Sequence, residues 1–472
     1  MLRLLAALVL GLTAVGAAGW PDGSVEAVID AEMPGSGVPG VAYAVVADGE
    51  VTSTGARGVV EAGTGRAVTA DTPFQAGSIT KSVTALAVMQ LVEAGQVDLD
   101  AAVSQYLDGF SGQPAGAVTV RQLLSHTSGF STLQGNAAHT DATGGPDELA
   151  RLVDRLATLA PAYGPGERWE YSNTNYQILG RLVEVVSGQD YQAYVTDRIL
   201  QPVGMADSFV ADGEVHEEMA TGHRPWFGTK RPLAEQRTDR ATAPQGGLVA
   251  SAHDLALYLA MMMNGQDDVL SADGKAQMMR PASPASPFYG LGWFIDIDNG
   301  TVWHSGSTPG FESLATMAPA EGDGVVVLVN AGSGIGFGET TQLRNAVTAA
   351  ALGLDDDGEG SRWSQQALFV GLVLLPVVYL LAMVWAWRHR DAVRAKSTHA
   401  FGRFSLGFPL LTTLVAAWVI LWLVPTLIGS QLDTLRLFQP DLGLLLIATA
   451  VTGVAWAAFR LAVAYSGRPN PA

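Results

Sequence analysis

The chain has 472 residues, of which 48% are hydrophobic and 15% charged. This composition is too apolar for a disordered protein, and the length exceeds that of one small domain, so at least two structural units are expected. The formal net charge of −18 excludes a surface built to neutralise a phosphate backbone, so no nucleic-acid partner is expected. The absence of cysteine excludes disulfides, thiolate metal sites and a cysteine nucleophile.

The charge is distributed unevenly along the chain. Residues 363–472 contain eight Lys and Arg and three Asp and Glu, a net charge of +5, which leaves −23 on the preceding residues. A strongly acidic segment joined to a slightly basic one indicates that the two are adapted to different surroundings.

The first 19 residues are arranged like an export signal. Arg3 precedes an apolar core from Leu4 to Gly16, and small residues continue to Gly19. We therefore predict a signal peptide at residues 1–19, cleaved near Ala18, with an uncleaved anchor as the alternative. In both cases the chain that follows would be exported.

The first elements predicted after this signal are a hairpin and a helix. β-Rich runs at residues 41–46 and 51–55 flank Asp48-Gly49, whose glycine tolerates positive φ, so a β-hairpin is expected. A helix is predicted over residues 78–94. Its apolar positions exceed a single stripe, so it should be largely buried.

A second helix and three strands complete the predicted first domain, residues 20–353. The helix is expected over residues 175–187, with Asn173 or Asn175 as its N-terminal cap. Strand-like segments separated by Gly/Pro turns follow at 301–303, 311–317 and 325–330. Strands at both ends with helices between them predict an α+β fold.

Ser78 and Lys81 form the first candidate catalytic pair. Residues three apart share a face of a helix, so the amine can reach the hydroxyl. Lys81 also opens an apolar helix, where an ammonium group is costly unless it is paired or loses its proton. Lowering the pKa of lysine from about 10.4 to about 7 requires roughly 4.6 kcal/mol. The alternative is a solvated serine and lysine on the surface.

Two further segments contain residues suited to proton transfer or substrate binding. Tyr171-Ser172-Asn173 precedes the second helix, and a phenol can pass a proton when a nearby ammonium stabilises its phenolate. His304-Ser305-Gly306-Ser307 lies on a predicted strand. Gly306 would let a substrate approach the backbone, and the Ser307 amide could point at an oxyanion. Taken alone, a tyrosine or a strand histidine is usually structural.

Three uncharged apolar runs follow a short charged linker predicted at residues 354–366. The runs span residues 367–387, 406–428 and 442–459. Each run is close to the ~20 residues that a helix needs to cross hydrocarbon. We predict three transmembrane helices within residues 367–465 and a cytoplasmic tail at residues 466–472.

The loops between these runs predict the orientation in the membrane. Between the first two runs, Asp391 is accompanied by five basic residues, Arg388, Arg390, Arg394, Lys396 and Arg403. Cytoplasmic loops carry an excess of Lys and Arg, so this loop is expected inside and residues 20–353 outside. The sequence thus predicts a multi-pass protein of the cell membrane with an extracytoplasmic catalytic domain, and it identifies no protein partner.

Taken in order, the Ser78, Tyr171 and His304 segments resemble the serine β-lactamase and penicillin-binding-protein superfamily, on the class C β-lactamase and D-aminopeptidase/esterase side. The resemblance covers nearly all of residues 25–350. It includes four more segments typical of that family, Leu123–Gly129, Pro202–Met205, Gly246–Val249 and Tyr289–Trp293. It implies an antiparallel sheet flanked by helices, a helical region, and a cleft between the two.

The resemblance implies a hydrolase that forms an acyl-enzyme and needs no metal or organic cofactor. By motif, Ser78 is the nucleophile, Lys81 its base or proton relay, and Tyr171 the relay to the leaving group and water. Asn173 would bind a substrate amide, and the backbone N–H groups of Ser78 and Ser307 would form the oxyanion hole. Which of Lys81 and Tyr171 holds the proton stays open, because coupled groups titrate as a pair.

His304 departs from the Lys-Thr-Gly pattern of many relatives, in which the lysine helps to bind a substrate carboxylate. With a pKa near 6.5, histidine is mostly neutral at pH 7. Efficient hydrolysis of β-lactams is therefore not expected. Relatives with His-x-Gly include esterases and D-amino-acid peptidases, so the resemblance implies an ester or a D-amino-acid peptide, including one from the cell wall, bound along His304, Gly306 and Ser307. The alternatives are a β-lactamase or D-Ala-D-Ala carboxypeptidase, and a non-hydrolytic receptor or sensor.

Overall fold

A computed structural model describes residues 24–137, 145, 147–235, 238–355, 358 and 360–466. The chain forms two compact units, Met1–Glu359 and Gly360–Ala472. The predicted signal peptide and the tail beyond Ser466 lie outside the described residues.

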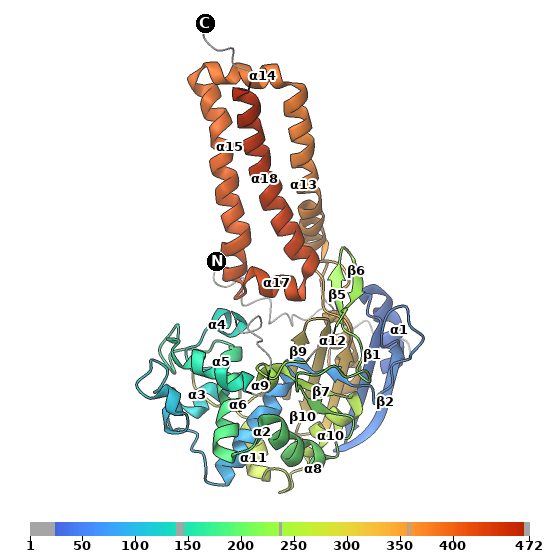
Figure 1. Ribbon diagram of the computed structural model, residues 1–472. Helices are drawn as coiled ribbons and strands as arrows, with labels where there is room; N and C mark the ends of the chain where they lie inside the picture. Colours follow the sequence, from blue (N-terminus) through green and yellow to red (C-terminus); the bar gives the residue numbers. More distant parts are fainter. Residues whose placement is uncertain are drawn as a thin grey trace. The chain divides into compact units, whose positions relative to one another are not determined.

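The centre of the first unit is a six-stranded antiparallel sheet with strand order β2-β1-β11-β10-β9-β8 (Figure 1). Its strands are β1 Gly40–Ala47, β2 Glu50–Gly58, β8 Phe294–Asp296, β9 Thr301–Thr308, β10 Phe311–Ala318 and β11 Asp323–Val329. The predicted hairpin and the three predicted late strands are confirmed. Asp48 and Gly49 turn the hairpin with φ of 53° and 79°. The hairpin then joins the late strands because β1 pairs with β11, Val41 opposite Val329.

Alternation along the strands gives the sheet two buried faces. Val325, Val327 and Val329 of β11 pack in one cluster with α1 (Val25–Ser36) and α12 (Thr341–Leu352). Val326 and Leu328 point the other way, into a cluster that includes Leu255 and Leu259 of α10 (Ala252–Met263). The sheet is therefore covered by helices on both sides, which is the predicted α+β architecture.

The remaining elements of the first unit form the helical region and small sheets. The helices are α3 Val120–Leu124, α4 Thr132–Ala137, α5 Glu148–Ala157, α6 Asn173–Ser187, α7 Tyr191–Val195, α8 Gln201–Val203, α9 Ala243–Gly246 and α11 Ala272–Met278. The short strands are β3 Phe74–Gln75, β4 Phe209–Val210, β5 His223–Trp226, β6 Thr229–Pro232 and β7 Leu248–Ala250.

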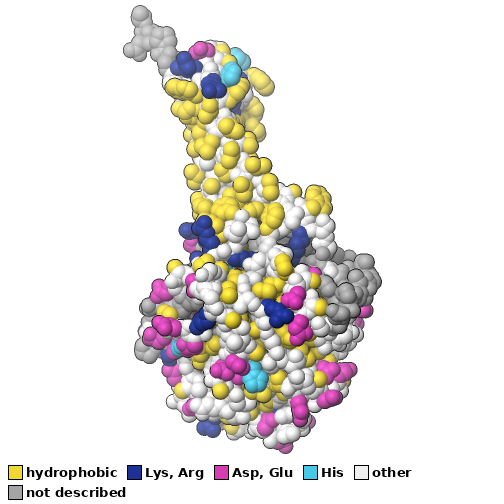
Figure 2. Space-filling view, turned by 90° about the vertical axis from the view of Figure 1, so that its right-hand side faces the viewer, with side chains coloured by type: hydrophobic (Ala, Val, Ile, Leu, Met, Phe, Trp, Pro, Cys, Tyr) yellow, Lys and Arg dark blue, Asp and Glu magenta, His cyan; other side chains and the backbone are white. Residues whose placement is uncertain are grey.

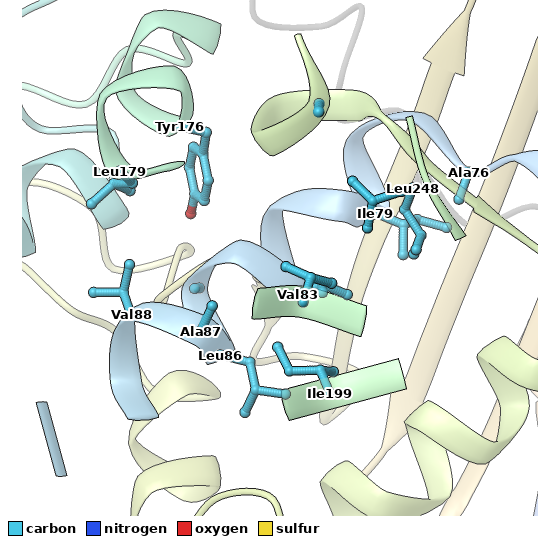
Figure 3. Packing of buried hydrophobic residues seen from close by; sticks show 14 of the residues in the cluster. Ala76, Ile79, Val83, Leu86, Ala87, Val88, Tyr176, Leu179, Ile199 and Leu248 are labelled. Atoms are coloured by element: carbon cyan, nitrogen blue, oxygen red, sulfur yellow. The ribbon is translucent and has the colours of Figure 1, made fainter. Parts of the chain in front are cut away.

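Helix α2 (Thr80–Glu93) lies in the interior of the first unit, in the same apolar cluster as residues of the central sheet. Residues 80–89 are buried on every side, as expected for a helix without a polar face. Figure 3 shows Val83, Leu86 and Ala87 of this helix beside Ile199 and Tyr176 from other helices. The helix begins later than predicted, because Ser78 lies in a 3₁₀ turn, Gly77–Ile79, that precedes it.

Helix α6 ends as predicted and begins differently. Gly188 stops it in the left-handed conformation with φ of 69°. The cap position is occupied by Ser172 and not by Asn173 or Asn175. Both asparagine side chains make other contacts, since Asn173 accepts a hydrogen bond from Lys81 and Asn175 accepts one from Ser128.

The second unit contains three helices that are long and apolar enough to cross a membrane: Trp363–Arg388, Ala400–Leu427 and Pro440–Tyr465. The first is α13 and the third is α18. The second consists of α15 (Ala400–Trp418), a π-helical turn and α16 (Val424–Leu427), which follow one another without a break. Two short helices, α14 (Arg390–Ala395) and α17 (Leu432–Phe438), connect the three. Helix α13 takes in residues 363–366, which the sequence assigned to the linker, because no residue there interrupts the helix. Figure 2 shows hydrophobic side chains along the sides of this unit and basic ones gathered at one end.

Two glycines bring the turn before α2 against β9. A Cβ atom on Gly306 would lie 2.0 Å from Ala76 O and 2.3 Å from Ser313 Oγ. Gly77 has φ of 55°, and a Cβ on it would lie 2.7 Å from Ser307 N. Ser313 Oγ donates to Ala76 O at 2.7 Å. The Ser78 and Ser307 backbones are thus held at a separation that side chains would prevent.

Gly306→Ala should destabilise the protein by about 1–3 kcal/mol, because the added methyl overpacks the contact between β9 and the turn. The expected result is a lower Tm of the full chain in detergent. Gly65→Ala is the matched control, because no atom lies within 4 Å of a Cβ there. Equal Tm values for the two variants would contradict this account of the contact.

Candidate active site

Four predicted catalytic or binding side chains meet at the N-terminal end of α2. Lys81 Nζ lies 3.0 Å from Ser78 Oγ and 2.8 Å from Asn173 Oδ1. The same nitrogen lies 4.8 Å from the centre of the Tyr171 ring. Ser78 and Tyr171 are only partly buried, so the hydroxyl is reachable, whereas Lys81 is completely buried.

The three partners of Lys81 satisfy either protonation state of its amine. Besides Ser78 and Asn173, Nζ contacts the backbone oxygen of Gln245 at 2.7 Å. As an ammonium, Lys81 donates one hydrogen bond to each partner. As a neutral amine, it can donate to the two carbonyl oxygens, which leaves its lone pair for the Ser78 O–H. The arrangement therefore prepares the amine to accept the serine proton.

Burial lowers the pKa of Lys81 well below its ordinary value. The physical cause is loss of hydration of the charged form, and none of the three hydrogen-bond partners carries a negative charge to oppose it. A lysine in these surroundings can act as a base near neutral pH.

Gln245 is a member of this site that sequence reasoning missed. Its carbonyl is presented by the short helix α9, which Thr84 holds against α2 through a hydrogen bond of 2.6 Å to Pro244 O. Gly180 of α6 lets Pro244 approach, since a Cβ there would lie 2.1 Å from the proline ring. A backbone carbonyl leaves no side-chain signal. Only the neighbouring Gly246–Val249 segment pointed to this region.

Tyr171 immediately precedes Ser172, the cap residue of α6, and its phenol faces Ser78. Burial raises the pKa of Tyr171, and a hydrogen bond with the Ser78 side chain opposes this only in part. Because burial lowers the pKa of Lys81 and raises that of Tyr171, the two directions favour a neutral amine beside a neutral phenol.

His126 supports the Tyr171 segment from behind. Its Nδ1 accepts from Ser172 N at 3.1 Å and lies 3.0 Å from Asn175 Nδ2. Its ring centre is 4.3 Å from that of Tyr171. Burial lowers the pKa of His126 well below its ordinary value, so the ring stays neutral. His126 therefore positions the tyrosine and does not face the reacting groups.

His304 is enclosed by protein, although sequence reasoning assigned it to substrate binding. It is 1% exposed, its Nδ1 donates to Ser305 O at 2.7 Å, and its Nε2 lies 3.2 Å from the Tyr289 hydroxyl. Burial, and secondarily the charge of Lys81, lowers the pKa of His304 to about 3. The neutral ring offers no cation to a substrate carboxylate.

The Asn173 side chain is also engaged at both ends. Its Oδ1 accepts from Lys81, and its Nδ2 donates to Asn136 Oδ1 at 3.1 Å. The structure thus places Asn173 as a support for the lysine, while its contact with a substrate amide stays a prediction.

Gly306 and Ser307 lie at an edge of β9 that β8 leaves uncovered, because β8 pairs only with Thr301–Trp303. In the two-residue β9–β10 hairpin, Thr308 and Phe311 form the closing pair. The N–H of the adjacent Ser307 therefore points away from β10. Ser307 is exposed and lies against the turn that holds Ser78. Two N–H groups can converge there on one oxygen atom.

Comparison with known families supports this geometry. The family model described as Beta-lactamase matches residues 25–350, more than half of the chain. The chain belongs to the β-lactamase family. Its fold is therefore that of a family of serine hydrolases, and the resemblance stated from the motifs is confirmed.

Members of the β-lactamase family resemble this chain over most of their length. Penicillin-binding protein 4 of Amycolatopsis lactamdurans is 34% identical over 323 residues, which cover 64% of this chain and 83% of the relative. Protein flp of Staphylococcus aureus strain MW2 is 25% identical over 426 residues, which cover 86% of this chain and 83% of the relative.

Two solved structures have the same fold. The octameric penicillin-binding protein homologue from Pyrococcus abyssi is 30% identical with a TM-score of 0.61, covering 71% of this chain and 78% of its own. A D-stereospecific amidohydrolase from Streptomyces is 27% identical with a TM-score of 0.53, covering 65% of this chain and 93% of its own.

Asn173→Asp should move the acidic limb of the pH–rate profile to higher pH by about one unit or more. A carboxylate in place of the amide would stabilise the ammonium of Lys81 and raise its pKa, so a higher pH would be needed to form the neutral amine. The measurement is the rate of fluorophosphonate labelling of the full chain against pH. Asn173→Ser adds no charge and should leave the acidic limb of the pH–rate profile at its original pH. If the acidic limb lies at the same pH in both variants, Lys81 is not the base whose titration limits the rate.

Proposed function

We propose that this protein is a membrane-anchored, extracytoplasmic serine hydrolase that acts through a Ser78 acyl-enzyme on an ester or a D-amino-acid peptide. The observation that carries the proposal is the 3.0 Å contact between Lys81 Nζ and Ser78 Oγ. The amine in this contact is buried and is held by two carbonyl oxygens. A serine with such a neighbour is suited to nucleophilic attack.

In the proposed reaction, Ser78 Oγ attacks the substrate carbonyl carbon while its proton passes to Lys81. The negative charge that develops on the carbonyl oxygen is stabilised by the N–H groups of Ser78 and Ser307. The proton then moves through Tyr171 to the leaving alcohol or amine as its bond to the carbonyl breaks. Water releases the acyl group by the same steps in reverse order, and Ser78 recovers its proton.

The substrate class rests on the neutral site and on a relative. His304 supplies no positive charge, so recognition of a free carboxylate at this position is disfavoured. The Streptomyces relative is a D-stereospecific amidohydrolase. An ester, or an amide of a D-amino acid, needs no cation at residue 304 and is in keeping with the activity of the Streptomyces relative.

Three features support the proposed location. The second unit contains three apolar helices of sufficient length to cross a membrane. The first loop between them is basic, which favours the cytoplasm. Residues 1–19 have the pattern of an export signal. Together these features favour a hydrolase unit on the outer side of the membrane.

Ser78→Ala should abolish labelling by a fluorophosphonate, measured by intact mass of the full chain in detergent. The variant leaves the two carbonyl partners of the Lys81 amine in place, so the protein should still fold, with at most a small decrease in Tm. Ser187→Ala, at the end of α6, removes another hydroxyl and should keep the label. A folded parent that does not label would favour a receptor without hydrolytic activity.

The neutral His304 leads to a prediction about substrates. An amide-capped D-alanyl-D-alanine peptide should have a kcat/KM about tenfold or more above that of the same peptide with a free carboxylate, since burying an unpaired carboxylate is unfavourable. A preference of the parent for the free carboxylate would instead indicate a carboxypeptidase.

A further inference from the structure

The β5–β6 hairpin is a basic and aromatic surface feature on an acidic unit. Residues 223–232 contain Arg224, Lys230 and Arg231 and no Asp or Glu, whereas the chain before residue 363 has a net charge of −23. Trp226 and Phe227 stand at the turn, and Phe227 is 39% exposed. Aromatic rings next to basic groups are typical of surfaces that contact lipid headgroups.

The turn of this hairpin adopts an unfavourable conformation for its sequence. Phe227 has φ of 49° and Gly228 has φ of 81°, so both central residues are left-handed. Asn-Gly is the preferred pair in such a turn, and a bulky residue with positive φ is uncommon. The fold thus accepts local strain at a position whose main effect is to expose an aromatic ring.

The hairpin is also held rigidly. The Lys230 ammonium donates to the carbonyl oxygens of Gly332 and Gly338, which fixes β6 to the loop after β11. The Arg231 guanidinium lies 4.1 Å from the centre of the Trp226 ring, and the Trp226 and Phe227 rings meet edge to face at 5.2 Å. Rings and charges are therefore arranged before any partner arrives, which lowers the entropy lost on binding.

A short connection tethers the first unit to any membrane that the second unit spans. Helix α12 ends at Leu352 and α13 begins at Trp363. The ten residues between them reach at most about 35 Å when fully extended. An anionic bilayer surface would repel most of the acidic unit and attract this hairpin, since each Lys or Arg near such a surface contributes about 1 kcal/mol.

We propose that the tip of the β5–β6 hairpin docks on the anionic phospholipid surface of the membrane in which the three C-terminal helices lie. Phe227 and Trp226 enter the headgroup region, and Arg231 pairs with lipid phosphate. The proposal rests on the membrane anchoring stated in the proposed function and is independent of the hydrolytic chemistry.

The cysteine-free chain allows the proposal to be tested by site-specific labelling. Thr229→Cys in the full chain carries an environment-sensitive dye beside the intact tip, and the protein is reconstituted in phosphatidylcholine–phosphatidylglycerol vesicles containing nitroxide-labelled lipid. Ile297→Cys is the matched control, because Ile297 is 70% exposed in a turn flanked by Asp296 and Asp298. The dye at residue 229 should be quenched at least twofold more than the dye at residue 297.

Two variants made in the Thr229→Cys protein separate docking from folding. Phe227→Asn creates the favoured Asn-Gly turn, so its Tm should not fall, yet its quenching should drop at least twofold. Arg231→Glu, or vesicles without phosphatidylglycerol, should have the same effect on quenching. Equal quenching at residues 229 and 297 in protein that floats with the vesicles would overturn the docking.

Vesicle flotation and fluorophosphonate labelling together show which of the proposals fails: the membrane anchoring, the docking of the hairpin or the hydrolase activity. A chain that does not float with vesicles overturns the anchoring and the docking together, whatever the result at Ser78. Loss of fluorophosphonate labelling with normal flotation and quenching contradicts the hydrolase alone and leaves the docking supported.

Discussion

The first unit depends on hydrogen bonds that satisfy one buried amine. Lys81 has no exposed surface, and its nitrogen is held by the adjacent turn at Ser78 and by two segments far along the chain, the start of α6 and the carbonyl of Gln245. A buried amine without such partners would strongly destabilise the fold. The contacts that make Lys81 tolerable also join α2, α6 and α9, so stability and reactivity share the same hydrogen bonds.

The sequence predicted elements whose signals are local. Two β-rich runs beside Asp48-Gly49 were enough for the first hairpin, and Gly188 was enough for the end of α6. The position of Ser78 in a turn before α2, and the side-chain partners of Asn173, depend on distant segments that local patterns do not encode. The spacing of three residues was enough to pair Ser78 with Lys81. Only the resemblance to the β-lactamase family assigned Tyr171 to the same site, because its separation along the chain gives no local signal of proximity.

His304 illustrates the limit of transferring a role by motif. The motif correctly placed the residue on the strand that ends beside Ser78, yet the ring is enclosed by Ser305 and Tyr289. Whether a histidine faces a substrate or the interior depends on the rotation of one side chain, which spacing cannot specify. The same difficulty does not affect Ser307, because its predicted contribution is a backbone N–H whose direction is set by the hairpin register.

The β5–β6 hairpin is hydrogen-bonded to the turn that follows the strand of Ser307. The backbone N–H of His223, at the base of the hairpin, bonds to Gly310 O in the β9–β10 turn and to Asn330 O at the end of β11, both at 3.0 Å. These bonds join the hairpin directly to the central sheet. If the hairpin tip rests on the membrane, it therefore fixes the orientation of the proposed active site relative to the membrane surface. Substrates would then be selected by the distance of their reactive bond from the membrane as well as by their chemistry.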